Sequence, residues 1–133
     1  MDSQRSDAIV FFGATGDLAY KEVFPALQGL VQRHRLDVPI IGVARSGWDL
    51  EQLRKRAHDS LRHHGKVDED AFAKLSGLLR YIDGDYTDPK TFQRLRKTLG
   101  DAERPLHYLA IPPSMFTVVT EGLAGAGAMD GAR

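Results

Sequence analysis

The 133-residue sequence contains no cysteine, which excludes disulfide bonds and thiolate chemistry. Its 18 basic and 18 acidic residues leave no formal net charge, whereas a nucleic-acid-binding surface requires a basic excess. No apolar run approaches the roughly 18 residues of a membrane span, and residues 1–7 lack the apolar segment of a secretory signal. We therefore expect a cytoplasmic protein that acts neither on nucleic acid nor at a membrane. The 42% apolar content suffices for one folded domain.

One stretch organises the rest of the chain. Ile-Val-Phe-Phe at positions 9–12 leads directly into a turn that contains Gly13, Gly16 and Ala19. A short continuous apolar run is typical of a buried parallel strand, and a glycine-rich turn from such a strand into a helix is the phosphate-binding element of dinucleotide folds. Gly13 permits a tight turn, Gly16 lets a phosphate approach the backbone, and Ala19 lets the helix pack closely. The alternative is an ordinary strand-to-helix turn.

Apolar strands and amphipathic helices alternate along the whole sequence. This alternation predicts an α/β fold, a Rossmann-type doubly wound parallel sheet with strand order 3-2-1-4, helices on both faces and a site at the carboxyl ends of the strands. Because the sequence stops where a further strand is expected, we predict a sheet of about four strands that is truncated before further strands. Residues 1–7 are a predicted disordered leader and residues 8–133 the domain. The expected strands are 8–13, 39–44, 79–82 and 106–111, and the expected helices are about 17–35, 49–64, 67–79, 89–99 and 114–125.

Several positions predict local features of these helices. Pro25 falls inside the first helix, so we expect a bend or a short first segment there. Asp49 and Gln52 form a possible capping box. Pro89 suits a first helical position, and Ser114 or a neighbour is expected to cap the last helix.

The end of the second strand predicts which coenzyme binds. In dinucleotide folds an acidic residue at this point holds the ribose 2′-hydroxyl of NAD, whereas an arginine accommodates the 2′-phosphate of NADP. This sequence has Arg45 followed by Ser46, with no acidic residue before Asp49. The guanidinium fork of Arg45 suits phosphate oxygens, and Thr15 can add a hydroxyl contact. The pattern favours NADP. The alternative is a solvated arginine at a strand end.

The residues of positions 13–25, Gly-Ala-Thr-Gly-Asp-Leu-Ala-Tyr-Lys-Glu-Val-Phe-Pro, carry a family likeness. The stretch resembles the N-terminal coenzyme domain of glucose-6-phosphate dehydrogenases, which show Gly-Ala-Ser/Thr-Gly-Asp-Leu-Ala, then basic residues, an apolar pair and proline. Val-Ala-Arg-Ser at 43–46, Gly-Asp-Tyr at 84–86 with Phe-Gln-Arg-Leu at 92–95, and Tyr-Leu-Ala-Ile-Pro-Pro at 108–113 also look like that family. The likeness covers nearly all of this sequence and about a quarter to a third of a family member.

The resemblance implies a function and a set of site residues. The function is the coenzyme-binding part of an oxidoreductase that uses NADP to oxidise glucose 6-phosphate at C1 to 6-phosphogluconolactone in the pentose phosphate pathway, with a homo-oligomeric parent. Lys21 is a possible substrate contact. The residues that would bind the coenzyme are Gly13, Ala14, Thr15, Gly16, Asp17, Leu18, Ala19, Arg45, Ser46, Ala110, Ile111, Pro112, Pro113 and Phe116, the last in place of a family tyrosine.

The sequence also departs from the family pattern. The family's basic run falls on Tyr20, Lys21 and Glu22, and its last lysine, close to the sugar phosphate, is Glu22 here. A carboxylate at that place repels a phosphate monoester. The segments that supply the family's general base are not in this sequence, so we expect the 133-residue chain alone to be inactive. A non-catalytic NADP-binding module and an unrelated NADP-dependent reductase are the alternatives.

Other possible sites are weaker. Tyr86 and Lys90 have the spacing of a short-chain dehydrogenase pair, but Pro89 favours a helix that begins after Tyr86. The acidic run at 83–88 lacks the glycine and distal glutamate of a calcium loop. His58, His63 and His64 lie on a charged helix without the spacing of metal ligands, and we predict no metal site.

Overall fold

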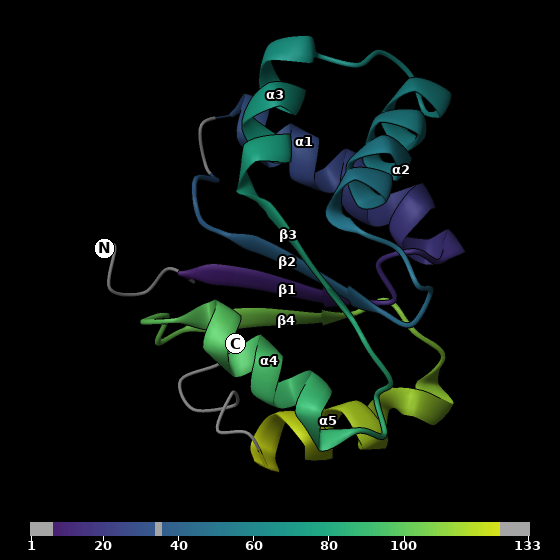
Figure 1. Ribbon diagram of the computed structural model, residues 1–133. Helices are drawn as coiled ribbons and strands as arrows, with labels where there is room; N and C mark the ends of the chain where they lie inside the picture. The colour runs from purple at the N-terminus through teal and green to yellow at the C-terminus, as the bar shows by residue number, and fades with distance from the viewer. Residues whose placement is uncertain (1–6, 34–35, 126–133) are drawn as a thin grey trace.

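The computed structural model describes residues 7–33 and 36–125. Its centre is a sheet of four parallel strands in the order β3-β2-β1-β4 (Figure 1). The predicted strand order is therefore confirmed. The strands are β1 (Ala8–Phe12), β2 (Ile40–Ala44), β3 (Leu79–Asp83) and β4 (Pro105–Leu109). All four carboxyl ends point to the same edge of the sheet, on the right in Figure 1.

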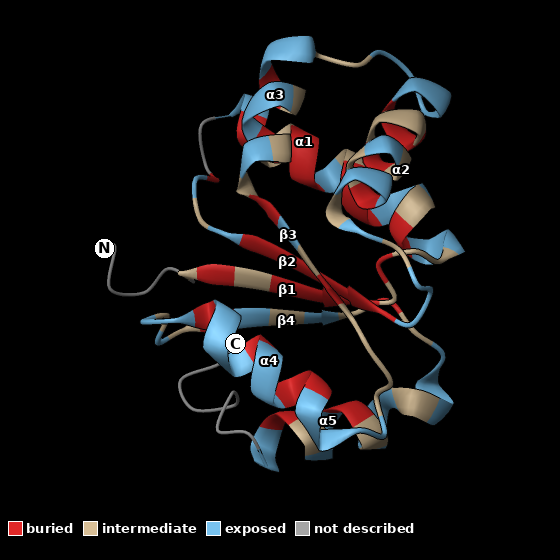
Figure 2. Ribbon diagram, in the orientation of Figure 1, coloured by how far each residue is buried: buried red, intermediate tan, exposed pale blue. Residues whose placement is uncertain are grey.

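Helices cover both faces of this sheet, as predicted. One face carries η2 (Ala19–Val23), α1 (Phe24–Gln32), α2 (Leu50–His63) and α3 (Glu69–Leu78), and the other carries α4 (Pro89–Leu99) and α5 (Phe116–Gly125) after the short turn η3 (Pro113–Met115). Because successive strand residues point to opposite faces, Phe11 joins the core beneath α1–α3, whereas Val10 and Phe12 join the core against α4 and α5. Figure 2 shows the buried sides of the helices turned toward the sheet.

Pro25 reshapes the first helix without breaking it. Helical backbone begins at Asp17, widens into the π-helical turn η2 and continues into α1, where Pro25 lies in the first turn. Proline has no N–H, and its ring clashes with the carbonyl four residues earlier in an α-helix. A wider turn, in which the Phe24 N–H bonds to the Ala19 carbonyl, relieves that clash. The predicted short first segment is therefore present, and its π-helical form was not foreseen.

The helix ends follow their capping residues. Asp49 and Gln52 form the predicted capping box, with both side-chain bonds at 2.9 Å, and Pro89 begins α4. Ser114 does not cap the last helix as expected, because it lies inside η3, where Pro112 occupies the capping position and has no side-chain donor or acceptor. The fourth strand also ends earlier than predicted, at Leu109.

Asp7 belongs to the folded domain rather than to a leader. Its carboxylate accepts hydrogen bonds from the backbone N–H groups of Glu103 at 2.6 Å and Arg104 at 2.7 Å, and this ties the start of β1 to the start of β4. The other six positions of the predicted leader, residues 1–6, and the expected loop after position 125 lie outside the described residues. Within the described ranges, no helix has the length and apolar character needed to cross a membrane.

Candidate functional site

The glycine turn after β1 is held in place by neighbouring strands. Gly13 has a φ of 81°, a left-handed conformation that glycine adopts without strain. Its N–H donates to the Val43 carbonyl at 2.9 Å and to the Tyr86 hydroxyl at 2.8 Å, and the Ala14 N–H donates to the same Val43 carbonyl at 3.2 Å. The Gly16 N–H closes the turn by donating to the Gly13 carbonyl at 3.0 Å.

Gly13 and Gly16 are glycines for different reasons. A Cβ on Gly13 would lie 2.1 Å from the Ala110 carbonyl oxygen, so the fold itself excludes a side chain there. A Cβ on Gly16 would meet only the Gly13 carbonyl oxygen, at 3.4 Å, which is an ordinary contact. The open face of Gly16 therefore serves no packing purpose within the described residues, and it leaves space beside the backbone where a phosphate can approach.

The helix that follows the turn offers N–H groups to an anion. The Tyr20 N–H donates to the Gly16 carbonyl at 3.2 Å, so Gly16 precedes the first helical turn, and the N–H groups of that turn have no carbonyl of the same helix to bond. Together with the positive end of the helix dipole they form an anion-binding position. Ala19 is fully buried in the core, as its predicted packing role requires, whereas Asp17 and Leu18 are exposed.

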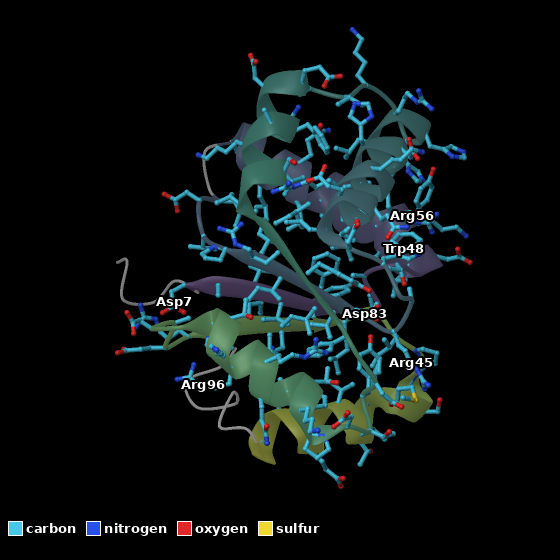
Figure 3. All side chains as sticks on the ribbon, in the orientation of Figure 1. Asp7, Arg45, Trp48, Arg56, Asp83 and Arg96 are labelled. Atoms are coloured by element: carbon cyan, nitrogen blue, oxygen red, sulfur yellow. The ribbon has the colours of Figure 1, made fainter. Side chains whose placement is uncertain are left out.

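The end of β2 lies beside this turn. The Thr15 and Ser46 hydroxyls are 2.5 Å apart, so the two predicted hydroxyl contacts do come together. The Arg45 side chain is 73% exposed, and its Nη1 donates to Asp85 Oδ2 at 3.0 Å. Gly42 allows β2 to lie close to the glycine turn, since a Cβ on Gly42 would lie 2.9 Å from the Cβ of Ala14. Arg45 thus stands at the carboxyl edge of the sheet (Figure 3).

The end of β3 organises the site, and the sequence analysis missed it. Asp83 Oδ1 accepts hydrogen bonds from the N–H groups of Ser46 and Gly47, both at 2.9 Å, and from the Tyr81 hydroxyl at 2.6 Å. Burial pushes the pKa of the Asp83 carboxyl upward, but the Tyr81 hydroxyl and the backbone donors stabilise the anion, and the net pKa is lowered. Asp83 therefore fixes the loop that carries Arg45 and Ser46.

Tyr86 is the second missed residue. Its hydroxyl accepts from the Gly13 N–H and donates to the Val43 carbonyl at 3.0 Å, so one side chain joins the glycine turn to β2. Burial raises the pKa of this hydroxyl, although the bond from Gly13 opposes the shift. The available signal was the Asp-Gly-Asp-Tyr-Thr-Asp sequence at a strand end, which from the sequence alone indicated only a family likeness and an incomplete calcium loop.

The segment after β4 forms the other side of the glycine turn. The Ala110 N–H donates to the Phe12 carbonyl at 3.0 Å, and the Ala110 carbonyl and Ile111 side chain pack against Gly13. Pro112 and Pro113 follow and are exposed. Phe116 begins α5 and is 39% exposed. The structure therefore brings 13–19, 45–46 and 110–111 to one edge of the sheet. Lys21 lies on η2 with its side chain exposed.

Comparison with known proteins identifies this arrangement. The family model described as "Glucose-6-phosphate dehydrogenase, NAD binding domain" matches residues 10–133. The chain belongs to the glucose-6-phosphate dehydrogenase family. A Mycobacterium bovis glucose-6-phosphate 1-dehydrogenase 1 is 42% identical over 128 residues, which are 96% of this chain and 28% of that protein. An Aspergillus niger glucose-6-phosphate 1-dehydrogenase is 33% identical over 92% of this chain and 26% of its own length. The chain thus spans about a quarter of the length of these relatives.

Solved structures of the same family agree. The chain superimposes on glucose-6-phosphate 1-dehydrogenase from Mycobacterium avium with a TM-score of 0.91 and 42% identity, covering 97% of this chain and 29% of that one. A glucose-6-phosphate dehydrogenase in complex with glucose 6-phosphate gives a TM-score of 0.82 and 31% identity, over 94% of this chain and 28% of that chain. The nucleotide-binding domain of the glucose-6-phosphate dehydrogenase family is therefore shown, and the alternative of an unrelated reductase is wrong.

The departure from the family pattern occupies the π-helical turn. Tyr20 packs against α2: the Arg56 guanidinium lies 4.2 Å from its ring centroid, and its hydroxyl is 3.0 Å from His63 Nδ1. Arg56 also reaches Asp17 in the glycine turn, at 3.9 Å. Lys21 and Glu22 are both exposed. Tyr20, which the resemblance sets against the first position of the family's basic run, is thus an aromatic contact between η2 and α2.

Proposed function

We propose that this chain binds NADP, as the coenzyme-binding part of an enzyme that oxidises glucose 6-phosphate. The observation that carries the proposal is the exposed Arg45 guanidinium at the end of β2, next to the paired Thr15 and Ser46 hydroxyls. An arginine at this point suits a 2′-phosphate, whereas NAD-binding domains use a carboxylate. The open face of Gly16 beside the start of the helix supplies the position for the pyrophosphate.

The proposal extends to the reaction of the longer protein. One relative is described as a complex with its substrate glucose 6-phosphate, and we infer the same sugar phosphate here. Oxidation at C1 to the 6-phosphogluconolactone, with hydride transfer to NADP, then forms part of the pentose phosphate pathway in the cytoplasm, in a homo-oligomeric parent. We infer that the chain binds the coenzyme and does not turn over the sugar by itself, since none of the residues that the structure describes at this edge of the sheet fits the role of the general base that takes the C1 hydroxyl proton.

Calorimetric titration tests the coenzyme proposal directly. The chain should bind NADP in the micromolar range, and Arg45→Ala should weaken NADP binding by about tenfold or more, the value of one charge-assisted phosphate contact. NAD binding should change little, because NAD lacks the 2′-phosphate. Arg62→Ala is the matched control, since the Arg62 side chain is 74% exposed and contacts Asp59 at 4.0 Å, much as Arg45 contacts Asp85.

Two results of this titration contradict the proposal. The first is equal loss of NADP and NAD affinity in Arg45→Ala, which would place Arg45 outside the 2′-phosphate site. The second is binding of neither coenzyme by a chain whose thermal unfolding is cooperative, which would make the glycine turn purely structural in this chain.

A non-catalytic NADP-binding module is the second candidate, and Glu22 favours it. Its carboxylate is exposed on η2, at the position where the family pattern has a lysine near the sugar phosphate. Glucose 6-phosphate titrated into the NADP-saturated chain separates the candidates. A module should show no sugar binding, in either the wild type or Glu22→Lys. Appearance of binding in Glu22→Lys would instead show that a substrate site is present and blocked by charge.

A further inference from the structure

The Arg45 side chain is held by one carboxylate. Arg45 Nη1 lies 3.0 Å from Asp85 Oδ2, across a separation of 40 residues in sequence. Arg45 is 73% exposed, so packing contributes little to its orientation. A long exposed side chain of this kind samples many rotamers unless a polar partner restrains it. The position of the guanidinium therefore depends on how firmly Asp85 is fixed.

Asp85 is fixed by its own turn. Its other oxygen, Oδ1, accepts hydrogen bonds from the Thr87 N–H and the Thr87 hydroxyl, both at 2.8 Å. These bonds are the main reason that the pKa of the Asp85 carboxyl is lowered, and the charge of Arg45 adds to the shift. The two oxygens thus have separate tasks: Oδ1 anchors the carboxylate to the loop after β3, and Oδ2 faces Arg45.

The geometry leaves most of the guanidinium available. Arginine has five N–H donors in a planar fork, and the bond to Asp85 uses one at Nη1. The remaining donors can bind phosphate oxygens while the bond to Asp85 persists. We propose that Asp85 is a positioning residue for coenzyme selectivity, which restrains Arg45 for the 2′-phosphate of the dinucleotide. This inference rests on the proposed NADP function and deepens it.

The main alternative to positioning is that the Asp85 carboxylate and the phosphate of the ligand compete for Arg45. The Arg45 side chain is 73% exposed and the Asp85 side chain 37% exposed, so repulsion between carboxylate and phosphate is partly screened by water and salt. The restraint comes from a direct 3.0 Å hydrogen bond, which salt weakens less than a repulsion across a longer distance. Positioning therefore predicts that loosening Asp85 weakens NADP binding, and competition predicts that it strengthens NADP binding.

Asp85→Asn is the informative substitution. Asparagine has a single oxygen, and if this oxygen keeps the two bonds from Thr87, the amide NH₂ faces the Arg45 donors and cannot accept from them. Arg45 is released while the turn stays intact. We expect NADP binding to weaken about three- to tenfold, the factor that corresponds to immobilising one long side chain, with NAD binding unchanged within about twofold by the same reasoning.

Two further variants separate position from charge. Thr87→Ala removes one anchor of Asp85 without changing any charge, so it should weaken NADP binding in the same direction and by a smaller factor. Asp88→Asn is the matched control: Asp88 caps α4 by accepting from the Lys90 N–H at 2.9 Å, and its substitution removes one negative charge from the same loop. It should leave the ratio of NADP to NAD affinity unchanged.

The double variant Arg45→Ala/Asp85→Asn completes the cycle. If Asp85 acts through Arg45, its substitution has no further effect on NADP binding once Arg45 is absent. Calorimetric titration with NADP and NAD, and a melting temperature for each variant, give all the required values. Equal or tighter NADP binding by Asp85→Asn overturns the inference, as does a penalty that persists without Arg45. Failure of the wild type to bind NADP, or an Arg45→Ala chain as selective as the wild type, overturns the proposed function and this inference with it.

Discussion

The two sides of the candidate coenzyme site are built in different ways. On the β2–β3 side, Asp83, Asp85 and Tyr86 tie the strand ends together with side-chain hydrogen bonds that cross 36 to 73 positions of sequence. On the β4 side, the segment from Ala110 to Pro113 contacts the glycine turn through backbone and apolar atoms, and its prolines are exposed. Under the proposed NADP function, the residues that would set selectivity therefore lie on the β2–β3 side, whereas the β4 side contributes backbone and apolar contacts.

Gly13→Ala should have the largest effect, because Gly13 is the point where the two sides meet. The substitution forces an unfavourable φ of 81° on alanine and places its Cβ 2.1 Å from the Ala110 oxygen. We expect the free energy of unfolding to fall by about 3 kcal/mol or more, since strain and steric overlap add. Urea denaturation followed by circular dichroism measures the loss. An unchanged midpoint would show that the turn relaxes and does not join the two sides.

Gly16→Ala is the matched control for this experiment. The same added methyl group meets only an ordinary contact, so stability should change by less than about 1 kcal/mol. NADP affinity should nevertheless fall, because the methyl group occupies the space proposed for the phosphate. The pair of variants separates a glycine that the fold requires from one that the ligand requires.

Asp83→Asn should have an intermediate effect that depends on pH. The folded pKa of Asp83 lies below the ordinary value of 3.8, so its contribution to stability is present above that value and is lost as the pH falls through the lower, folded pKa. The variant should be less stable than the wild type at pH 7, by about 1–2 kcal/mol for weakened charge-assisted bonds. Below pH 3.8 the difference should shrink. A difference that stays constant from pH 7 to pH 3 would contradict this role for Asp83.

Phe116→Ala should have the smallest effect, and it tests the β4 side of the site. Phe116 is 39% exposed at the start of α5, and surface substitutions usually change stability by about 0.5 kcal/mol or less. The ratio of NADP to NAD affinity should stay at the wild-type value, because the position proposed for the 2′-phosphate lies on the other side of the site. Thermal unfolding and the same titrations test both points. A changed ratio would show that the two sides are coupled.

Sequence patterns predicted the strands and helices but did not predict the side-chain contacts between the strand ends. Apolar runs and helical spacing determine strands and amphipathic helices locally, so the sheet order and the Asp49 cap could be predicted. Asp83, Asp85 and Tyr86 form hydrogen bonds with residues that are distant in the sequence and come close only once the sheet has formed. The hydrophobic periodicity of the sequence carries no information about such long-range contacts. The π-helical turn depends on how one proline ring is accommodated. The exposure of Pro112 and Pro113 depends on which residues pack around the end of β4, and a local sequence pattern does not specify that packing.

The π-helical turn has a consequence for how this chain can change during evolution. Ala19 and Val23 are buried at its two ends, while Tyr20, Lys21 and Glu22 between them lie at or near the surface. Substitutions at the exposed Lys21 and Glu22 alter the charge that faces the solvent without altering the packed core, whereas substitution of Tyr20 also removes its contacts with α2. The turn therefore offers two surface positions, Lys21 and Glu22, at which the charge beside the glycine turn can change while Ala19 and Val23 keep the helix packed on the sheet.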